Sequence, residues 1–240
     1  MMTLPLVVIT GASSGIGAAC AEHFAKRGHP LLLLARRIER LEALALPNSL
    51  CRQLDVTDGT ALKQAVLEAE ALFGPVDLII NNAGQMQLSL LAEQSPEAWS
   101  QMLDVNVKGV LNGIRAVLPQ MLARRHGTII NIGSVAGRKT HPRHAVYSGT
   151  KFAVHAISEN LREEVAPHNI RVIVIAPGAT DTELVSHCTG DIQEGFEAWK
   201  ADIGGVMSSR DVAEAVGFAY VQPQHLCVRE IVLAPTRQEP

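Results

Sequence analysis

Tyr147 and Lys151 stand four residues apart in this chain, and Ser134 lies upstream of both. Residues at this spacing share one face of a helix, so the Lys151 ammonium can lie near the phenol. A phenol with an ordinary pKa of about 10 exchanges protons poorly at neutral pH, and a nearby cation favours its ionised form. The Ser134 hydroxyl can hydrogen-bond a substrate oxygen as charge develops there. These three side chains predict a general acid/base with a substrate-orienting partner.

A glycine-rich turn follows the first apolar run, with Gly11, Gly15 and Gly17 in a G-x-x-x-G-x-G spacing. Glycines after a strand let the chain turn tightly and approach a pyrophosphate closely, while the next helix aims N–H groups at the anion. Strand-to-helix turns also use glycine for steric reasons alone. The spacing differs from the G-x-G-x-x-G of the commonest dinucleotide sites. It still predicts a dinucleotide site if a strand precedes it and a helix follows.

Short, β-branched-rich apolar runs alternate with longer helical stretches along the whole chain, a pattern typical of βαβ units around a parallel sheet. The predicted strands are residues 6–10, 31–35, 50–55, 78–81, 128–132, 171–175 and 229–233. The predicted helices are residues 15–27, 60–73, 96–122, 147–166 and 210–220. We expect one α/β domain over residues 1–240, with a doubly wound, Rossmann-type sheet of seven parallel strands flanked by helices. Residues 181–207 show no clear period and follow a strand end, where such sheets bind ligands, so we predict a substrate-binding lid there.

The glycine spacing resembles that of the classical short-chain dehydrogenase/reductase family, and the resemblance covers almost the whole chain. Asp55 looks like the family's adenine contact, Asn81-Asn82-Ala83-Gly84 like its signature turn, and Pro177-Gly178 with Thr182 like its nicotinamide-facing segment. The resemblance implies this set of cofactor-binding residues: Gly11, Ser13, Ser14, Gly15, Ile16, Gly17, Arg36, Arg37, Asp55, Val56, Asn82, Ala83, Gly84, Tyr147, Lys151, Pro177, Gly178, Thr180 and Thr182.

The same resemblance implies a role for each catalytic residue. Tyr147 is expected to act as general acid/base, Lys151 to lower the phenol pKa and bind the cofactor ribose, and Ser134 to orient the substrate. Asn106 matches the family position that holds a water linking Lys151 to solvent, although the surrounding residues would also suit a simple helix bend.

The end of the second strand predicts which nicotinamide cofactor binds. A carboxylate there would accept hydrogen bonds from the adenosine ribose, whereas arginine accommodates a 2′-phosphate. The chain has Arg36 and Arg37, with no acidic residue before Glu39. Guanidinium groups grip phosphate in a bidentate manner, so NADP is favoured over NAD, with two solvated surface charges as the other interpretation.

Composition limits the partners. A net charge of −3 without runs of like charge indicates small-molecule partners and no nucleic acid. No apolar stretch reaches the ~20 residues that cross a bilayer, so we expect no membrane partner. The scattered Cys20, Cys51, Cys188 and Cys227 fit neither a disulfide framework nor a zinc site, and they favour a cytoplasmic location. His141-x-x-His144 spans a proline and lacks an obvious third ligand, so we expect no metal.

Five basic residues between the serine and the tyrosine are expected to line one wall of the pocket and to suit a substrate carboxylate, unless they simply face solvent or another subunit. They are Arg138, Lys139, His141, Arg143 and His144.

The sequence therefore predicts an NADP-dependent oxidoreductase acting on a secondary alcohol or ketone. Arg36, Arg37 and the ending 228–233 most resemble bacterial 3-hydroxy acid or serine dehydrogenases. The alternatives are a non-catalytic NADP-binding sensor or scaffold, disfavoured because serine, tyrosine and lysine are all present, and an extended-branch epimerase or dehydratase, disfavoured by the glycine spacing. The resemblance also implies a homotetramer built partly through the helices 96–122 and 147–166.

Overall fold

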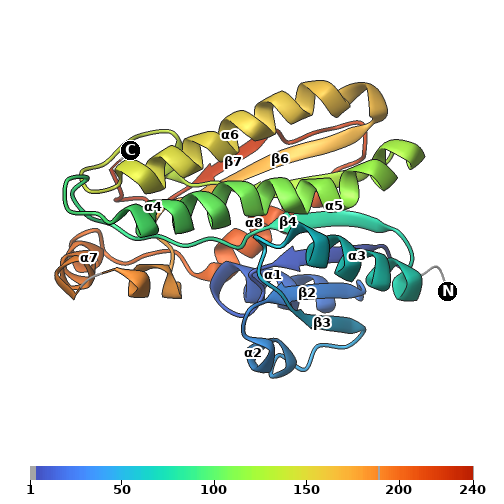
Figure 1. Cartoon of the computed structure of the whole chain (residues 1–240), viewed down its shortest axis with the longest axis horizontal. Helices are drawn as coiled ribbons and strands as arrows, with labels where there is room; N and C mark the ends of the chain where they lie inside the picture. The colour runs from blue at the N-terminus through green and yellow to red at the C-terminus, as the bar shows by residue number, and fades with distance from the viewer. Residues whose placement is uncertain (1–3, 189, 240) are drawn as a thin grey trace.

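The computed structural model describes residues 4–188 and 190–239 and contains one seven-stranded parallel sheet in the order β3-β2-β1-β4-β5-β6-β7 (Figure 1). The strands are β1 (Leu6–Thr10), β2 (Leu31–Ala35), β3 (Ser49–Gln53), β4 (Val76–Asn81), β5 (Gly127–Ile132), β6 (Ile170–Pro177) and β7 (Glu230–Leu233). The predicted doubly wound sheet is confirmed, and each strand end lies within two residues of its predicted position. The strand order reverses between β1 and β4, and such a reversal leaves a ligand crevice at the carboxyl ends of the strands.

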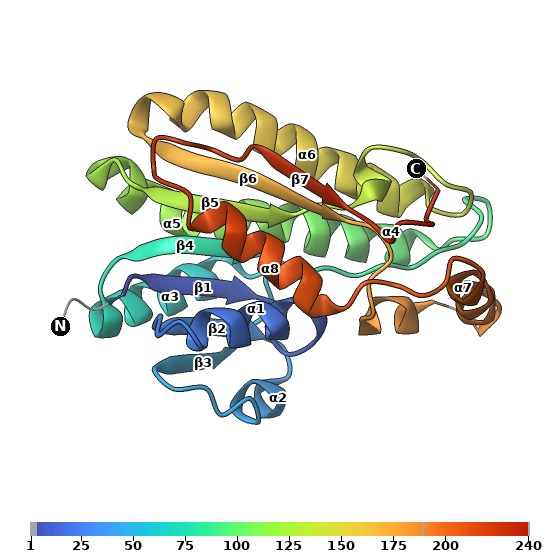
Figure 2. The same cartoon turned by 180° about the vertical axis from the view of Figure 1, so that it is seen from behind.

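Helices cover both faces of the sheet. The face towards the viewer in Figure 1 carries α3 (Gly59–Phe73), α5 (Gly109–Arg124) and α6 (Ala145–Val165). The opposite face, seen in Figure 2, carries α1 (Gly15–Ala25) and α8 (Ser209–Tyr220). Because successive strand side chains point to opposite faces, Leu6 and Val8 of β1 join the first apolar cluster while Val7 and Ile9 join the second. This two-sided burial fixes the strand ends that carry the site.

The predicted helix 96–122 is interrupted by one wider turn. It consists of α4 (Pro96–Leu103), a π-helical turn (Asp104–Lys108) and α5, which continues to Arg124. Ser95 caps its start, since its Oγ accepts a hydrogen bond from the Ala98 N–H at 3.2 Å. π-helical turns are rare and occur often at functional sites, and this one contains the buried Asn106.

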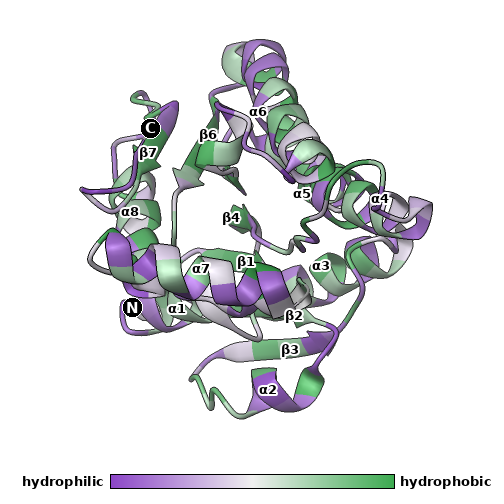
Figure 3. Ribbon diagram, turned by 90° about the vertical axis from the view of Figure 1, so that its left-hand side faces the viewer, coloured by the Kyte–Doolittle hydropathy of each residue, from purple (hydrophilic) through white to green (hydrophobic). Residues whose placement is uncertain are grey.

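Residues 181–207 show no clear period in the sequence, and no helix was predicted there, but the structure forms a 3₁₀ turn and a helix in this segment. The 3₁₀ turn (Glu183–His187) and α7 (Gly190–Asp202) occupy most of this segment, and Thr182 caps the turn by accepting a hydrogen bond from the Leu184 N–H. Figures 1 and 2 place α7 beyond the carboxyl ends of the strands, and Figure 3 shows both hydrophilic and hydrophobic residues along it. The short helix α2 (Ile38–Glu42) and the 3₁₀ turns Val135–Gly137 and Ala166–His168 were also not predicted.

Candidate active site

A cleft of about 950 Å³ opens at the carboxyl ends of the strands, and residues of the 3₁₀ turn and α7 form part of its lining. Nearly all the predicted site residues line it: Gly11, Ser13, Ser14, Gly15, Ile16, Arg36, Arg37, Asp55, Val56, Asn82, Ala83, Gly84, Ser134, Tyr147, Lys151, Pro177, Gly178, Thr180 and Thr182. Gly17 and Asn106 do not line the cleft and instead support it. Sites of this size accept drug-sized or larger ligands.

The glycine turn has the geometry of an anion cradle. Gly11 and Gly15 have φ values of 65° and 53°, a left-handed conformation that favours glycine. Gly17 is a packing residue, since a Cβ there would lie 2.3 Å from the Gly11 carbonyl oxygen. Among the residues that the structure describes, no side chain caps α1, so its first backbone N–H groups remain for a ligand. The turn therefore fits a pyrophosphate at a helix N-terminus.

Thr10 and Asn82 hold this turn in place from below. The Asn82 Nδ2 donates hydrogen bonds to the carbonyl oxygens of Thr10 at 3.0 Å and Gly11 at 3.1 Å. In return the Thr10 Oγ1 accepts from the backbone N–H groups of Asn82 and Ala83. The sequence analysis missed Thr10, because its partner lies across the sheet rather than along the chain.

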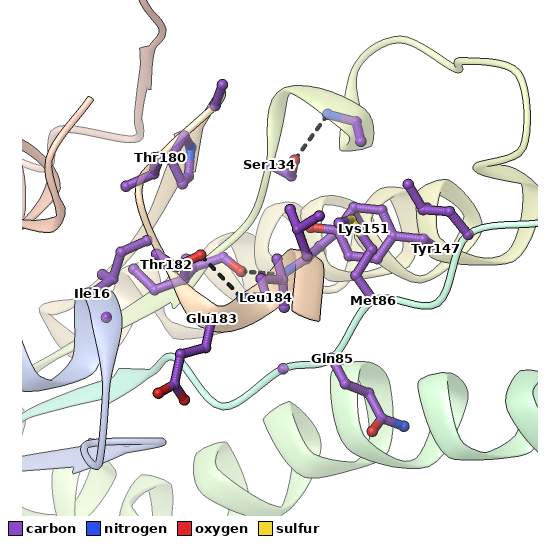
Figure 4. A pocket seen from close by; sticks show the side chains of 18 of the residues that line it. Ile16, Gln85, Met86, Ser134, Tyr147, Lys151, Thr180, Thr182, Glu183 and Leu184 are labelled. Carbon is purple, nitrogen blue, oxygen red and sulfur yellow. Dashed lines mark hydrogen bonds between the residues drawn. The ribbon is translucent and has the colours of Figure 1, made fainter. Parts of the chain in front are cut away.

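Ser134, Tyr147 and Lys151 come together on the side of the cleft where β5 ends and α6 begins (Figure 4). Tyr147 and Lys151 are only 6% and 8% exposed. The Lys151 Nζ lies 5.8 Å from the Tyr147 ring centroid and donates a hydrogen bond to the Ile132 carbonyl at 2.9 Å. The Ser134 Oγ accepts from the Ala136 N–H at 3.0 Å, which fixes the hydroxyl beside the phenol. The predicted trio is therefore one cluster.

Burial shifts the proton equilibria of this cluster in opposite directions. Desolvation raises the pKa of Tyr147 to about 12, and hydrogen bonding with Ser134 opposes that rise. Desolvation also lowers the pKa of Lys151 to about 8. At neutral pH the phenol holds its proton while most of the lysine remains charged. The cluster can therefore donate a proton to an oxygen in the cleft and stabilise the phenolate that remains.

Asn106 joins the π-helical turn to the cleft edge and to α6. Its Oδ1 accepts from the Gln85 N–H at 2.8 Å, while its Nδ2 donates to the Gln85 carbonyl at 2.9 Å and to the Thr150 Oγ1 at 3.0 Å. Thr150 in turn donates to the Tyr147 carbonyl at 2.7 Å. Asn106 thus positions the first turns of α6, which carry Tyr147 and Lys151. That Asn106 holds a water linking Lys151 to solvent stays a prediction. Gln85 and Thr150 were not found from the sequence.

The basic wall is smaller than predicted. Arg138 does not line the cleft, because its guanidinium forms an ion pair with Glu230 on β7. Arg143 lines the cleft, and its Nη1 lies 3.1 Å from the Asp191 Oδ2 on α7. Lys139, His141 and His144 also line the cleft, but burial lowers the pKa of His144 and favours its neutral form. Internal carboxylates therefore offset much of the positive charge.

A cluster of arginines lies at the end of the cleft that is next to the loop after β2. The Arg37 Nη2 donates to the Ser14 Oγ at 3.0 Å and the Ser13 Oγ at 3.3 Å. Its Nη1 pairs with the Glu183 Oε2 at 2.9 Å, and Arg40 pairs with the Glu183 Oε1 at 2.5 Å. The side chain of Arg36 is exposed. Arg36 and Arg37 were predicted from the sequence, whereas Arg40 and Glu183 were not.

Asp55 forms the opposite edge of this end of the cleft. Its Oδ1 accepts hydrogen bonds from the Thr57 N–H at 2.9 Å and the Thr57 Oγ1 at 2.8 Å. Burial alone would raise the pKa of Asp55, but these hydrogen bonds and the Arg36 charge outweigh it and lower the pKa. The carboxylate is therefore ionised and fixed.

Apolar side chains surround the reactive hydroxyls. Tyr147 packs with Met86, Met102, Ala136 and Cys188 in a buried cluster. Further apolar residues of the cleft come from the segment after β4, the 3₁₀ turn Glu183–His187 and α7: Leu88, Leu184, Val185, Ile192, Phe196 and Trp199. Such walls exclude water and favour a substrate with apolar groups next to its reacting carbon.

The described residues, 4–188 and 190–239, form neither a metal-ligand cluster nor a membrane-spanning helix. Within those ranges, no three His, Cys, Asp or Glu side chains come close enough together to hold a metal ion. None of the helices in the described part of the chain combines the length and apolar character needed to span a bilayer. Cys20, Cys51, Cys188 and Cys227 are free thiols.

Known proteins share this architecture over nearly the full chain. A family model described as short chain dehydrogenase matches residues 5–192. An uncharacterised oxidoreductase of Staphylococcus saprophyticus is 40% identical, over 97% of this chain and 96% of its own. Serine dehydrogenase in a closed form with NADP+ matches with a TM-score of 0.92 and 32% identity, covering 98% of this chain and 96% of that one. An alcohol dehydrogenase of the archaeon Thermococcus sibiricus, complexed with 5-hydroxy-NADP, matches with a TM-score of 0.85 and 28% identity over 98% of both chains.

Proposed function

The chain belongs to the short-chain dehydrogenase family, and on that basis we propose that this oxidoreductase is NADP-dependent and interconverts a secondary alcohol and a ketone. The observation that carries the proposal is the buried cluster of Ser134, Tyr147 and Lys151, in the same cleft as the glycine turn. The glycine turn would hold the pyrophosphate of a dinucleotide, and Tyr147 and Lys151 lie in the same cleft, where they would face its nicotinamide end. Hydride transfer is the chemistry that a bound nicotinamide supplies.

Each side chain of the cluster has a separate task. Ser134 donates a hydrogen bond to the substrate oxygen and orients it towards Tyr147. Tyr147 gives its phenolic proton to that oxygen in the reducing direction and removes it in the oxidising direction. The Lys151 ammonium stabilises the phenolate, and its position beside Gly84 suits a ribose hydroxyl as well. Asn106 acts through Gln85 and Thr150 as a positioning residue.

The preference for NADP rests on the arginines after β2. Arg36 and Arg37 line the cleft where a ribose 2′-phosphate would lie, and guanidinium groups are suited to that dianion. The matching structures of serine dehydrogenase and the archaeal alcohol dehydrogenase carry NADP+ and 5-hydroxy-NADP respectively, which supports the same assignment.

Replacing Arg36 with Asp tests the cofactor assignment. Hydrogen bonds to charged groups contribute ~1.5–3 kcal/mol, and the new carboxylate would repel phosphate, so selectivity for NADP over NAD in kcat/KM should fall at least tenfold. Arg210→Asp is the matched control, because the Arg210 side chain is 78% exposed and does not line the cleft. Equal use of NAD and NADP by the wild-type enzyme would contradict the assignment.

A 3-hydroxy acid is a second candidate substrate. The structural match to serine dehydrogenase and the basic residues at the cleft, including Arg143, favour it. If Arg143 reads a carboxylate, the enzyme should prefer a hydroxy acid over its methyl ester, and Arg143→Ala should remove that preference. Equal rates on acid and ester would favour a neutral substrate, in line with the apolar walls.

We also propose how the chain is organised and assembled. Residues 1–240 form one functional domain in which residues 181–207 act as the substrate lid. Two separate faces expose large apolar side chains, with Leu111 and Phe152 on α5 and α6 and Phe218 on α8, which supports a homotetramer. The free thiols are compatible with work in the cytoplasm.

A further inference from the structure

The lid touches the cofactor end of the cleft at its first residues. A Cβ on Gly15 would lie 3.1 Å from the Thr182 Cγ2, so the glycine turn and the root of the lid are in close contact. The next residue, Glu183, points its carboxylate away from Tyr147 and Ser134 (Figure 4). That carboxylate bridges Arg37 and Arg40, at 2.9 Å and 2.5 Å. An acidic side chain of the lid therefore binds an arginine of the cofactor site.

Arg37 is shared between three parts of this site. It lies in the loop after β2, its Nη2 donates to Ser14 and Ser13 of the glycine turn, and its Nη1 faces Glu183. All of these groups except Arg40 line the cleft. The guanidinium that is suited to a 2′-phosphate is thus already paired with an anion from the protein itself.

We propose that Glu183 is a specificity-determining residue that competes with the 2′-phosphate of NADP for Arg37. This inference rests on the proposed function, since it requires the phosphate to bind at Arg36 and Arg37. NAD lacks that phosphate and leaves the pair of Glu183 and Arg37 undisturbed. Glu183 therefore lowers the affinity for NADP and has little effect on the affinity for NAD. Because Glu183 is one of the first residues of the lid, the type of cofactor determines whether the start of the lid stays paired with Arg37.

The competition follows from charge and geometry. A phosphate at Arg37 places about two negative charges within several ångströms of the Glu183 carboxylate, and at such distances repulsion is worth about tenfold in affinity even at the dielectric constant of water. Protonation of Glu183 does not remove this repulsion at neutral pH, because hydrogen bonds from Arg40 and Arg37 hold the pKa of Glu183 at about 2. When the phosphate takes Arg37, Glu183 retains Arg40 as its partner.

Binding of reduced cofactors to Glu183→Gln tests the inference. NADPH and NADH affinities would be measured by nucleotide fluorescence at low ionic strength, where screening is weak. Glu183→Gln should bind NADPH roughly five- to tenfold more tightly and NADH less than twofold more tightly. Glu197→Gln is the control, because it neutralises another lid carboxylate, whose partner is Lys200 and which does not line the cleft. It should leave both affinities unchanged.

A double-mutant cycle with Arg37→Ala shows whether the effect passes through Arg37. Glu183→Gln should change the affinity for NADPH at least threefold less in the Arg37→Ala background. Unchanged or weaker NADPH binding by Glu183→Gln alone would overturn the inference, and weaker binding would mean that Glu183 orients Arg37 for the phosphate. Wild-type protein that binds NADH as tightly as NADPH would instead overturn the proposed NADP preference, so the two failures are distinct.

Discussion

At the scale of single residues, burial determines the chemistry of Tyr147 and Lys151. Both side chains are less than one-tenth exposed, and desolvation disfavours the charged form of each. At neutral pH the buried Lys151 ammonium lowers the free energy of unfolding, because the proposed mechanism requires Lys151 to remain largely charged in order to stabilise a phenolate. A catalytic requirement of this kind conflicts with stability and makes the stability depend on pH.

The pH dependence of folding tests this conflict. The pKa of Lys151 is about 8 in the folded chain and 10.5 in its ordinary state, so between those values the unfolded chain binds more protons. The contribution of Lys151 to the free energy of unfolding therefore rises as the pH increases from about 8 towards 10.5, and this contribution is lowest below pH 8. In urea unfolding without cofactor, the Lys151 contribution should raise the free energy of unfolding of the wild type by about 2–3 kcal/mol from pH 7 to pH 10. The Lys151→Met variant should lack this rise. Parallel pH profiles for the two proteins would contradict a depressed Lys151 pKa.

The residues that the sequence could predict are those whose spacing or motif is local. Tyr147 and Lys151 are one helical turn apart, and the glycines lie within one turn. Glu183 was missed because its partner Arg40 is 143 residues away in the chain. Arg138 was assigned to the cleft wrongly for the same reason, since Glu230, 92 residues away, holds it elsewhere.

At the scale of elements, close packing between α1 and the glycine turn is the least tolerant feature. A Cβ at Gly17 would lie 2.3 Å from the Gly11 carbonyl oxygen and 2.6 Å from the Asn82 Nδ2. Backbone atoms cannot rotate away as side chains can, so α1 would have to move relative to β1 and take its N–H groups away from the cofactor phosphates.

Gly17→Ala should therefore weaken NADPH binding at least tenfold and lower the melting temperature, although alanine is the better helix former by about 1 kcal/mol. The matched control is Gly195→Ala in α7, where a Cβ would meet nothing within 4 Å. That control should keep its NADPH affinity and melt no earlier than wild type. Fluorescence titration and differential scanning calorimetry give both readouts, and intact NADPH binding by Gly17→Ala would contradict the packing argument.

Helices and strands that have a buried face were predicted well from the sequence, and those without a buried face were predicted poorly. The five strands β1, β2, β4, β5 and β6 are almost fully buried between two helical layers, and their pattern is visible in the sequence. By contrast, α7 has no buried residue in its described part, so it lacks the apolar period that identifies a helix. The π-helical turn was not predicted because its cause, the contact of Asn106 with Gln85, is tertiary.

At the scale of the whole molecule, apolar side chains remain exposed on two separate faces. Phe152 on α6 is 42% exposed and Phe218 on α8 is 58% exposed. A tetramer with two different interfaces would cover both faces, because closed symmetry pairs each face with its own copy.

Sedimentation velocity should find a tetramer for the wild type and dimers for Phe152→Asp and for Phe218→Asp, since each change places a charge in only one interface. The matched control is Leu72→Asp, which alters an exposed leucine on α3, outside both proposed interfaces. It should remain tetrameric. A monomeric wild-type protein would contradict the assembly and leave the redox assignment intact.

The central claim is that hydride transfer in this cleft depends on the Tyr147 proton, and single-turnover oxidation of NADPH by a ketone tests it most directly. Tyr147→Phe keeps the ring and removes only the hydroxyl. Wild type should oxidise bound NADPH and show a primary isotope effect with 4-deuterated cofactor. The variant should bind NADPH with nearly the same affinity and react ~10²–10⁴-fold more slowly. A variant that retains more than about a tenth of the wild-type rate would contradict the account.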